Sequence, residues 1–562
     1  MKNYKPWYET YWNRLEEEEK LLSELNFSLD EEQRVKFNRI VFRGKIVVKK
    51  QEYPLILVYP SGFPQFRIEI ISSKTNFPRH QSWINGNLCL LPHGQDGWDE
   101  SIRGVDMLQQ AIRLIEDSLE GSDIVAANEV DAPEPWSLFV PFGPSNLLIP
   151  PGLPRSIPEG SFGSFIMGDL GYTYVLIKII NQHSNHKGEY ALESIPIMAN
   201  TKQTNHGFWV KVSTTPPSLN PRELCSWLIR EAPGTKDTLL GLATGIKTRR
   251  ASPDLIAIIY PEENTSRNNY NDSWLAGFVQ KGDWLKPHYL DPNLWFERNP
   301  NLMELRNKKV MILGLGSIGS SIALELAKGG VGSLFLIDRE GIEVGNLVRH
   351  AANIHYLGRS KVNAVANLVQ LQNPFIKIEG LNASIGMTDD LSLTHKDLLS
   401  DVYEQMKKCD LIIDCMAHEG ATHLVNRMAV DLEIPVIHTW ITNGAWGGRV
   451  LRTIPHITGC YYCFSKQNVP EISSDPTTGE IFPRGCGFPT FTGASFDILS
   501  VVAATTRLSV QTLLNGIGYP NSNHDHICVE NLGIPIDKYP SVRSFKVQRN
   551  TQCPICGDRN GS

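Results

Sequence analysis

The sequence lacks any long apolar run. No stretch of it approaches the roughly 18 apolar residues that a membrane span requires. Its first residues, MKNYKPWYETYWNRLEEEEK, are mostly polar and charged and hold no apolar signal-peptide core. We therefore expect a cytoplasmic protein that has no membrane partner.

An excess of positive charge is missing as well. The chain has 54 Lys and Arg against 60 Asp and Glu, a net charge of −6, so we expect no nucleic-acid partner. Its composition, 41% hydrophobic and 20% charged, excludes a mostly disordered, collagen-like or coiled-coil protein. A length of 562 residues predicts three to four domains, at about 150 residues per domain.

Proline divides the chain. Eight of the 35 prolines fall between Pro133 and Pro158, a density that is typical of an extended linker. The alternating strand and helix patterns beyond it favour a doubly wound parallel sheet in the C-terminal part. We predict a multidomain protein with these parts: an α+β unit at 1–125, a Pro-rich linker at 126–160, a central α/β unit of unknown role at 161–290 and a C-terminal α/β unit at 291–562.

A glycine-rich turn follows the first strand of the C-terminal part. The buried run Val310–Leu313 leads directly into Gly314, Gly316 and Gly319, and a helix is predicted over Ser320–Lys328. A second strand ends at Asp338. Glycines let the backbone approach phosphate at a helix N-terminus, and the acid can bind ribose hydroxyls. The pattern fits NAD, FAD or ATP, so an NAD-dependent dehydrogenase remains an alternative.

Two cationic residues and an amide follow the ribose acid. They are Asn346, Arg349 and Lys361. Hydride transfer does not need further cations here, whereas a reaction on a triphosphate uses Arg and Lys to stabilise charge on the phosphates. As an ordered set behind the glycine turn, these residues favour ATP.

The ten cysteines include two tight pairs. Cys460 with Cys463 and Cys553 with Cys556 each have a two-residue spacer, which lets both sulfurs face one metal. A redox dithiol needs only one pair, so the duplication predicts a structural zinc site. We expect four further cysteines at core positions, namely Cys225, Cys409, Cys415 and Cys528.

Cys486 lies between the two pairs on a different kind of segment. Its neighbours, Pro483-Arg484-Gly485-Cys486-Gly487-Phe488-Pro489, predict an irregular exposed loop. Arg484 favours the thiolate, the nucleophilic form of cysteine. The alternatives to a catalytic role are an exposed bystander and a spare metal ligand.

Over about Arg298 to Cys556, the sequence resembles the adenylating domain of ubiquitin-activating enzymes and of their ThiF/MoeB-like bacterial relatives, which activate sulfur-carrier proteins. The resemblance rests on the glycine turn, an acid–x–acid pair, Asn-Leu-x-Arg and a downstream Lys. It implies ATP and Mg²⁺ as cofactors, a homodimer and the same zinc clip. By it, Asp338 binds ribose, Asn346 and Arg349 bind the phosphates, Lys361 binds the α-phosphate, Arg298 matches an arginine finger, and Cys486 holds a thioester.

Two positions depart from that family. His350 stands where the family has Gln. Ala417 and His418 stand where it has an Asp-Asn pair whose Asp helps to hold magnesium. Asp414 or Glu419 could hold the metal instead, and the alternative for Asp414 is a strand-end residue that bonds to the backbone.

The first part of the chain carries another candidate cysteine, Cys89. A helical pattern from Tyr8 to Leu25, with the acidic run Glu16 to Glu19 facing solvent, is followed by three strand-like runs and a helix over Asp106–Leu119. Together with Tyr59-Pro60-Ser61-Gly62-Phe63-Pro64, Gly86-Asn87-Leu88-Cys89-Leu90 and Trp98, this pattern resembles the ubiquitin-conjugating enzyme fold over residues 1–125. The resemblance implies that Cys89 receives a thioester and presents it to the amine of a target lysine.

The His-Pro-Asn element of that family is not intact. Its Asn donates a hydrogen bond to the oxyanion that forms when lysine attacks. Gln81 lies eight residues before Cys89 and could donate instead, with Asn85 and Asn87 as further candidates.

The whole chain resembles the conjugating protein of cyclic-oligonucleotide antiphage (CBASS) operons. That resemblance implies a fused activating and conjugating enzyme, whose activated partner is a cGAS-like nucleotidyltransferase joined through its C-terminal carboxylate to a target. A ubiquitin-like modifier of another operon would use the same residues. A non-catalytic adaptor with decayed sites is a further alternative.

Overall fold

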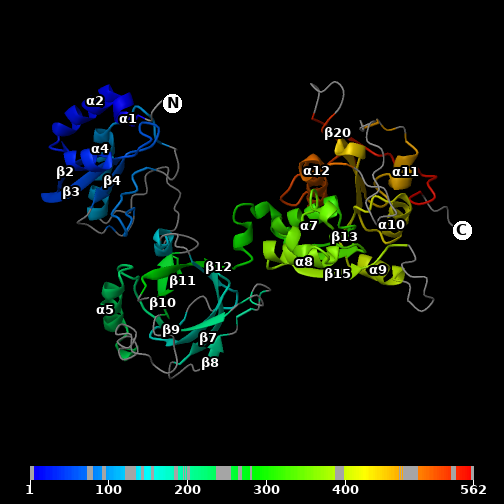
Figure 1. Ribbon diagram of the computed structural model, residues 1–562, viewed down its shortest axis with the longest axis horizontal. Helices are drawn as coiled ribbons and strands as arrows, with labels where there is room; N and C mark the ends of the chain where they lie inside the picture. Colours follow the sequence, from blue (N-terminus) through cyan, green and yellow to red (C-terminus); the bar gives the residue numbers. More distant parts are fainter. Residues whose placement is uncertain are drawn as a thin grey trace. The chain divides into compact units, whose positions relative to one another are not determined.

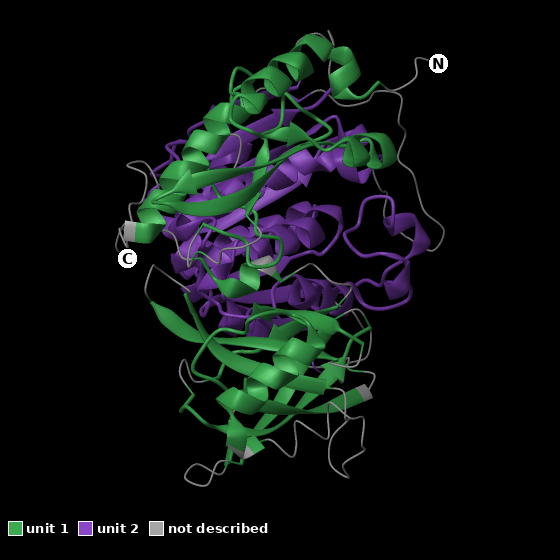
Figure 2. Cartoon of the chain, turned by 90° about the vertical axis from the view of Figure 1, so that its left-hand side faces the viewer, with its two compact units in different colours: residues 1–193, 201–289 green, residues 194–200, 290–562 purple. Residues whose placement is uncertain are grey.

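A computed structural model describes most of the chain. The described residues are 5–72, 77, 80–91, 97–120, 134–140, 145–153, 157–171, 173–182, 188–190, 192–193, 195, 198, 201, 203–235, 255–263, 269–278, 281–386, 398–467, 469, 471–472, 492–532 and 540–557. The chain divides into two compact units, one of Met1–Glu193 with Thr201–Tyr289 and the other of Ser194–Asn200 with Leu290–Ser562 (Figure 2). Among the described helices, each is too short or too polar to cross a membrane.

An antiparallel sheet begins the first unit. Its strands pair in the order β1 (Ser28–Leu29), β2 (Ile40–Val48), β3 (Gln51–Tyr59) and β4 (Glu69–Ser72). Alternate residues of β3 are buried, as expected for a strand with one covered face. The helices of this region are α1 (Trp7–Thr10), α2 (Trp12–Ser23), α3 (Glu31–Phe37) and α4 (Gly104–Glu120). The helix expected over Tyr8–Leu25 is therefore broken at Tyr11.

One member of the acidic run on α2 is buried, which corrects the expectation that Glu16 to Glu19 all face solvent. Glu18 is 0% exposed, and its carboxylate accepts hydrogen bonds from the Tyr59 hydroxyl at 2.7 Å and the Gly104 N–H at 2.9 Å. Helical periodicity places it on the same face as the buried Leu15 and Leu22. Burial raises the pKa of Glu18, and these hydrogen bonds oppose that rise.

The rest of the first unit is a sheet that closes on itself (Figure 1). The order is β5-β12-β11-β10-β9-β6-β7-β8, and β5 also pairs with β7, which completes a ring of seven strands. The bounds are β5 (Asn146–Ile149), β6 (Phe162–Asp169), β7 (Thr173–Asn181), β8 (Gly188–Tyr190), β9 (Gln203–Lys211), β10 (Leu255–Glu263), β11 (Tyr270–Phe278) and β12 (Asp283–Tyr289).

The ring has an apolar interior and one covered outer side. Leu255, Ala257 and Ile259 of β10 belong to the inner cluster, together with Trp209 and Trp274. The alternate residues of β10 pack with α5 (Pro221–Glu231), whose N-terminus is capped by Asn220. We expected a central α/β unit. In the residues that the structure describes, this unit is instead mainly β-sheet, and α5 is its longest helix.

The predicted Pro-rich linker 126–160 is wrong in part. It contains η1 (Trp136–Phe139) and strand β5, which pairs in register with β12 and β7. Prolines flank the run Ser145–Ile149 but leave it uninterrupted, so its N–H groups can join the sheet. Proline density alone does not reveal such a short strand.

The second unit is built on an eight-stranded sheet. The order is β15-β14-β13-β16-β17-β18-β19-β20, and the first five strands in this order are parallel to one another. The bounds are β13 (Lys309–Leu313), β14 (Ser333–Asp338), β15 (Lys377–Asn382), β16 (Leu411–Asp414), β17 (Val436–Ile441), β18 (Gly447–Thr453), β19 (His526–Glu530) and β20 (Ser541–Phe545). The last three strands run antiparallel to their neighbours.

Helices cover both faces of this sheet, so the expected doubly wound arrangement is confirmed (Figure 1). One apolar cluster joins the sheet to α7 (Ser317–Lys328), α8 (Lys361–Gln372) and α12 (Ser495–Leu514). The other joins it to α9 (Leu399–Met406) and α10 (Glu419–Asp431).

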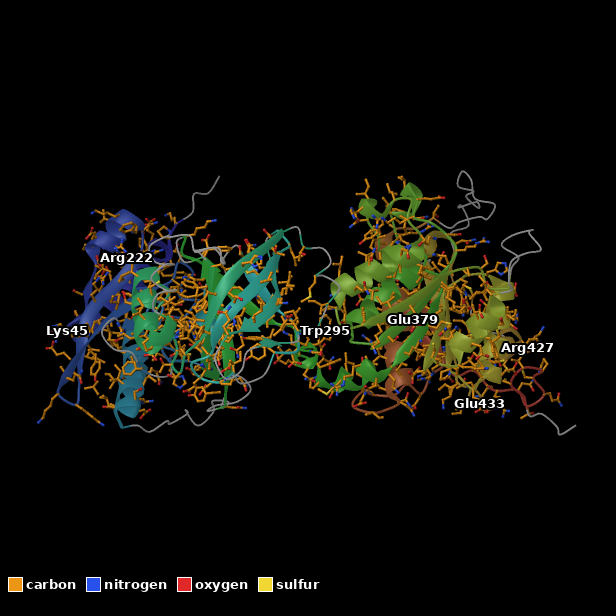
Figure 3. All side chains as sticks on the ribbon, turned by 90° about the horizontal axis from the view of Figure 1, so that it is seen from below. Lys45, Arg222, Trp295, Glu379, Arg427 and Glu433 are labelled. Carbon is orange, nitrogen blue, oxygen red and sulfur yellow. The ribbon has the colours of Figure 1, made fainter. Side chains whose placement is uncertain are left out.

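Charged side chains such as Lys45 of β2, Arg222 of α5, Glu379 of β15 and Arg427 of α10 point outwards (Figure 3).

A buried ion pair inside the first unit gives a testable prediction. Asp272 of β11 accepts hydrogen bonds from the Lys211 ammonium group and from the Ile157 N–H. Asp272→Asn leaves Lys211 buried without its counter-charge, so we expect unfolding of this unit to become easier by about 3–5 kcal/mol. Urea unfolding of the full chain, followed by tryptophan fluorescence, measures the change because Trp209 and Trp274 lie in the same interior.

The control removes a solvent-exposed pair of the same unit. Lys178 and Glu189 are 37% and 51% exposed, so Glu189→Gln should change the free energy of unfolding by less than about 1 kcal/mol. Equal effects of the two substitutions would contradict the prediction.

Candidate functional site

The glycine turn brings the start of α7 against the ends of two strands. Gly314 has φ +82°, and a Cβ on it would lie 3.0 Å from the backbone of Cys415, next to β16. A Cβ on Gly319 would lie 1.9 Å from the carbonyl oxygen of Gly314. Gly316 is the N-cap of α7, and a Cβ on it would meet nothing within 4 Å among the described residues. The turn therefore leaves open space in front of the helix N-terminus, where an anion is favoured.

Asp338 holds this turn from the neighbouring strand. It ends β14, and its two carboxylate oxygens accept hydrogen bonds from the Leu315 N–H at 2.6 Å and the Glu340 N–H at 2.7 Å. The predicted ribose acid is therefore placed beside the glycine turn. Its role towards a nucleotide remains a prediction.

Lys361 is linked to Asp338 through Glu340, the second acid of the acid–x–acid pair, to which the sequence analysis assigned no role. Lys361 begins α8, is 5% exposed, and forms an ion pair with Glu340, whose N–H bonds to Asp338. Burial alone would raise the pKa of Glu340, but the hydrogen bond and charge of Lys361 lower it. The Asp-x-Glu spacing was the available signal for Glu340.

Asn346 and Arg349 belong to the segment that follows. Asn346 ends η6 (Val344–Asn346), where its Oδ1 accepts a hydrogen bond from the Glu343 N–H at 3.0 Å. The backbone N–H of Arg349 bonds to the carbonyl oxygen of Asn346. Arg349 is half-buried, and burial lowers the pKa of its guanidinium.

His350 fastens this segment to the glycine turn. Its Nδ1 accepts a hydrogen bond from the Ala352 N–H at 2.9 Å, so Nε2 carries the proton and donates to the carbonyl oxygen of Leu315 at 2.8 Å. Burial lowers the pKa of His350, which keeps the ring neutral. The departure from the family's Gln therefore preserves a side chain with one donor and one acceptor.

The Asp414 carboxylate is hydrogen-bonded to neighbouring residues of its own unit. It ends β16 opposite Leu313 and is 2% exposed. Its oxygens accept hydrogen bonds from the Thr422 hydroxyl at 2.8 Å, from His438 Nδ1 at 2.8 Å and from the Met416 N–H at 3.0 Å. These three hydrogen bonds fix the position of the Asp414 carboxylate. Glu419, the other candidate, is the exposed first residue of α10.

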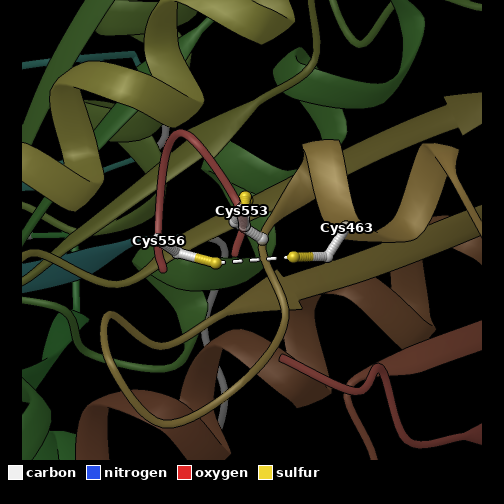
Figure 4. Close-up of side chains that lie close together, drawn as sticks. Cys463, Cys553 and Cys556 are labelled. Atoms are coloured by element: carbon white, nitrogen blue, oxygen red, sulfur yellow. Dashed lines mark hydrogen bonds between the residues drawn. The ribbon is translucent and has the colours of Figure 1, made fainter. Parts of the chain in front are cut away.

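The two cysteine pairs meet in one buried cluster, of which Figure 4 shows Cys463, Cys553 and Cys556. Cys460 precedes α11 (Tyr461–Ser465), Cys463 lies within it, and the second pair returns from the C-terminal segment. The sulfurs of Cys463 and Cys556 are 3.5 Å apart, those of Cys460 and Cys553 are 3.8 Å apart, and all four lie within 4.8 Å of one another. Four ligands at about 2.3 Å from Zn²⁺ stand about 3.8 Å apart in a tetrahedron. The cluster therefore fits structural zinc.

The four cysteines expected in the core differ in how far they are buried. Cys409 and Cys528 are buried, which confirms the prediction for them, and burial raises the pKa of each thiol. Cys415 and Cys225 are half-buried beside apolar clusters. Cys528 also contacts Arg449 Nη1 at 3.1 Å and His526 Nε2 at 3.3 Å, a buried polar group that the sequence did not reveal.

Cys486 and Arg484 lie outside the described residues. Their neighbours on the C-terminal side enter α12 at Ser495. The predictions for Cys486 therefore stand as predictions.

Cys89 lies on a short irregular hairpin of the first unit. Its N–H donates to the carbonyl oxygen of His80 at 2.7 Å, and the adjacent Leu88 forms an antiparallel bridge with Gln81. Cys89 is half-buried. Trp98, another residue of the predicted motif, donates from Nε1 to the carbonyl oxygen of Pro64 at 2.9 Å.

The Gln81 side chain is hydrogen-bonded to the backbone around it. Its Nε2 donates to the carbonyl oxygens of Ser72 at 3.0 Å and Gly86 at 3.4 Å, and its Oε1 accepts from the Phe77 N–H at 2.8 Å. The side chain holds the hairpin in place, so it could serve as an oxyanion donor only after losing one of these bonds. Asn85 Oδ1, for its part, accepts a hydrogen bond from the Asn87 N–H.

The cysteine cluster predicts bound metal. We expect about one zinc ion per chain in the purified protein, and Cys553→Ser should remove most of it and lower the melting temperature of the second unit. Elemental analysis and calorimetry of the full chain measure the two effects. Cys225→Ser, which alters a half-buried thiol on α5, is the matched control and should retain the metal. Loss of metal in both variants, or in neither, would contradict the assignment.

Comparison with known proteins identifies the C-terminal part. Residues 291–555 match the ThiF family. The Sinorhizobium fredii protein y4qC is 22% identical over 561 residues, which cover 90% of this chain and 88% of that protein. The sulfur carrier protein ThiS adenylyltransferase of Escherichia coli is 26% identical over 46% of this chain and 89% of its own length. Ubiquitin-like modifier-activating enzyme 5 of Drosophila virilis is 25% identical, and the match covers 44% of this chain and 58% of that protein. The C-terminal part of the chain is therefore a ThiF/MoeB-like adenylation domain.

Proposed function

We propose that this protein is an ATP-dependent enzyme that activates the C-terminal carboxylate of a protein partner and joins it to an amine. The observation that supports it is a ThiF-family domain on the same chain as Cys89, a cysteine that lies in the other compact unit. A dehydrogenase would use the same glycine turn, but the family match favours adenylation.

The activating step takes place at the glycine turn. The partner's carboxylate attacks the α-phosphate of ATP, an O–P bond forms, and pyrophosphate leaves. The first N–H groups of α7 face the phosphates, Asp338 accepts the ribose hydroxyls, and Asn346, Arg349 and Lys361 stabilise the charge that develops. Mg²⁺, when bound, neutralises further phosphate charge. The buried Asp414 is engaged elsewhere, so we assign it no step.

Three acyl transfers follow. The Cys486 thiolate attacks the acyl-adenylate, a C–S bond forms, and AMP leaves. The Cys89 thiolate then takes the acyl group and Cys486 leaves as a thiolate. A lysine amine of the target finally forms the amide and releases Cys89. Because both cysteines belong to one chain, the second transfer is intramolecular, with an effective concentration of order mM where the chain spans the distance.

The partner follows from the resemblance of the whole chain to the conjugating proteins of antiphage operons. We propose a cGAS-like nucleotidyltransferase as the activated protein, with a cytoplasmic homodimer as the working form. A ubiquitin-like modifier is the other partner of suitable chemistry, since its C-terminus also offers a free carboxylate.

Thioester formation tests the order of transfers. With ATP, Mg²⁺ and the partner, we expect a reductant-sensitive adduct on the native chain. Cys486→Ala should abolish it, whereas Cys89→Ala should retain the adduct and lose at least about 100-fold of target conjugation. Gel shift and mass spectrometry measure both, and Cys225→Ala is the control. Conjugation that survives Cys89→Ala would overturn the second transfer. Absence of any adduct and of pyrophosphate exchange would overturn the proposal.

The glycine turn offers a second test that separates stability from binding. Gly319→Ala places a methyl group 1.9 Å from the Gly314 carbonyl oxygen, so we expect the second unit to lose about 1–3 kcal/mol of stability. Gly316→Ala enters open space and should leave the melting temperature unchanged, but it should weaken ATP binding at least about tenfold by occupying the phosphate's place. Calorimetry and ATP titration measure the two. Unchanged ATP affinity in Gly316→Ala would contradict the phosphate assignment.

A further inference from the structure

An asparagine of α10 contacts the segment that carries the first cysteine pair. Asn426 is 0% exposed, and its Oδ1 accepts a hydrogen bond at 3.0 Å from the N–H of Tyr461, the residue after Cys460. One helical turn further on, Val430 packs in the same buried cluster as the four cysteines. Residues four apart lie on one face of a helix, so the face of α10 that carries Asn426 is the one directed at the cysteine cluster.

The nitrogen of the same amide is left without an acceptor. Asn426 Nδ2 is buried, and it makes no hydrogen bond among the residues that the structure describes. Since a backbone N–H donates to the other end of the amide, that end is the oxygen and Nδ2 is the donor. Buried donors in folded proteins are almost always satisfied, so this atom points to an acceptor that forms in the ligand-bound protein.

The Cys460 sulfur is the acceptor that fits Nδ2. Burial raises the pKa of the Cys460 thiol, and the Asn426 side chain opposes that rise, which places the amide close to this sulfur. A thiol is a weak acceptor, whereas the thiolate that binds zinc is a strong, charged one. Four thiolates carry more negative charge than Zn²⁺ offsets, so N–H donors around such a buried cluster are stabilising. Cys553 accepts one from the Ile555 N–H at 3.4 Å.

The same helix is bonded to the end of β16. Thr422 lies one turn before Asn426, and its hydroxyl donates to Asp414 at 2.8 Å. Asp414 pairs with Leu313 of β13, the strand that leads into the glycine turn. One face of α10 therefore carries a bond to this edge of the sheet and, four residues on, an amide beside the cysteine cluster.

We propose that Asn426 is a positioning residue of the metal centre and that its Nδ2 donates a hydrogen bond to the metal-bound thiolate of Cys460. This assignment rests on the fit of the four cysteines to zinc and is independent of the proposed reaction. The hydrogen bond withdraws charge from the sulfur and fixes its orientation, which strengthens metal binding. It also ties the zinc clip to α10, so that the metal stabilises the helix whose Thr422 bonds to Asp414.

Zinc release from the full chain tests this hydrogen bond. Asn426→Asp keeps the size of the side chain and the acceptor for Tyr461, but it replaces the N–H donor by a carboxylate oxygen. We expect zinc to pass to the chelator pyridylazoresorcinol about 10- to 100-fold faster than from the native chain. Thr422→Val is the matched control, because it removes another buried hydrogen bond of α10, and it should release zinc at the native rate. Equal rates of release from the two variants would overturn the proposal.

Cobalt in place of zinc separates this hydrogen bond from a general loosening of the fold. The thiolate-to-metal charge-transfer band of bound Co²⁺ depends on the energy of the sulfur electrons, which an N–H donor lowers. In Asn426→Ala the band should therefore move to longer wavelength, whereas in Thr422→Val it should keep its position. A band that does not move in Asn426→Ala would overturn the donor assignment, whatever the rate of zinc release.

Removal of the metal from the native chain tests the link to α10 without any substitution. When a chelator takes the zinc, amide hydrogen exchange over Glu419–Asp431 should become at least about tenfold faster. Helix α7, which packs on the other face of the sheet, should keep its rate. An unchanged rate over α10, or equal acceleration in both helices, would overturn the link. If the native chain binds no zinc, this proposal fails while the proposed reaction stands.

Discussion

The close approach of Gly319 to the carbonyl oxygen of Gly314 is the contact on which the C-terminal unit depends. It admits no side-chain atom, since a Cβ would stand 1.9 Å from that oxygen. The first turn of α7 is therefore pressed against the end of β13, and its free N–H groups face the edge where β14 and β16 also end. Parallel strands that end together gather their following residues at one edge, which is where open α/β sheets bind ligands.

The polar residues at that edge form a connected series. Lys361 pairs with Glu340, Glu340 bonds to Asp338, and Asp338 bonds to the glycine turn. His350 reaches the same turn from the segment that carries Asn346 and Arg349. The residues predicted to bind phosphate or ribose are therefore each linked to Leu315 by a short series of hydrogen bonds. They are Asp338, Asn346, Arg349 and Lys361. Preorganisation of this kind would let charged groups stabilise a bound phosphate without reorganising first.

The sequence predicted those features of the structure whose residues lie close together along the chain. A buried strand, a glycine turn and a helix follow one another between Lys309 and Lys328, so periodicity and glycine spacing were sufficient. The four cysteines of the cluster that fits zinc were predictable for the same reason, because each pair is defined within four residues. Glu18 was not predictable, since its partners Tyr59 and Gly104 lie 41 and 86 residues away. The closure of the central sheet by β5 likewise depends on pairing with β7 and β12, which no short window contains.

The same limit explains why the sequence assigned no role to the central part. Its informative residues are acids at a strand end, Glu262 and Glu263, which from the sequence alone are typical of a solvated turn. In the structure both are buried, and two buried carboxylates are stable only where donors satisfy them. Donors to them include the N–H groups of Glu134 and Ser137, so the acids fix segment 134–140, and the segment fixes Glu134 beside His80. The central sheet therefore holds the Glu134 carboxylate against the hairpin that carries Cys89.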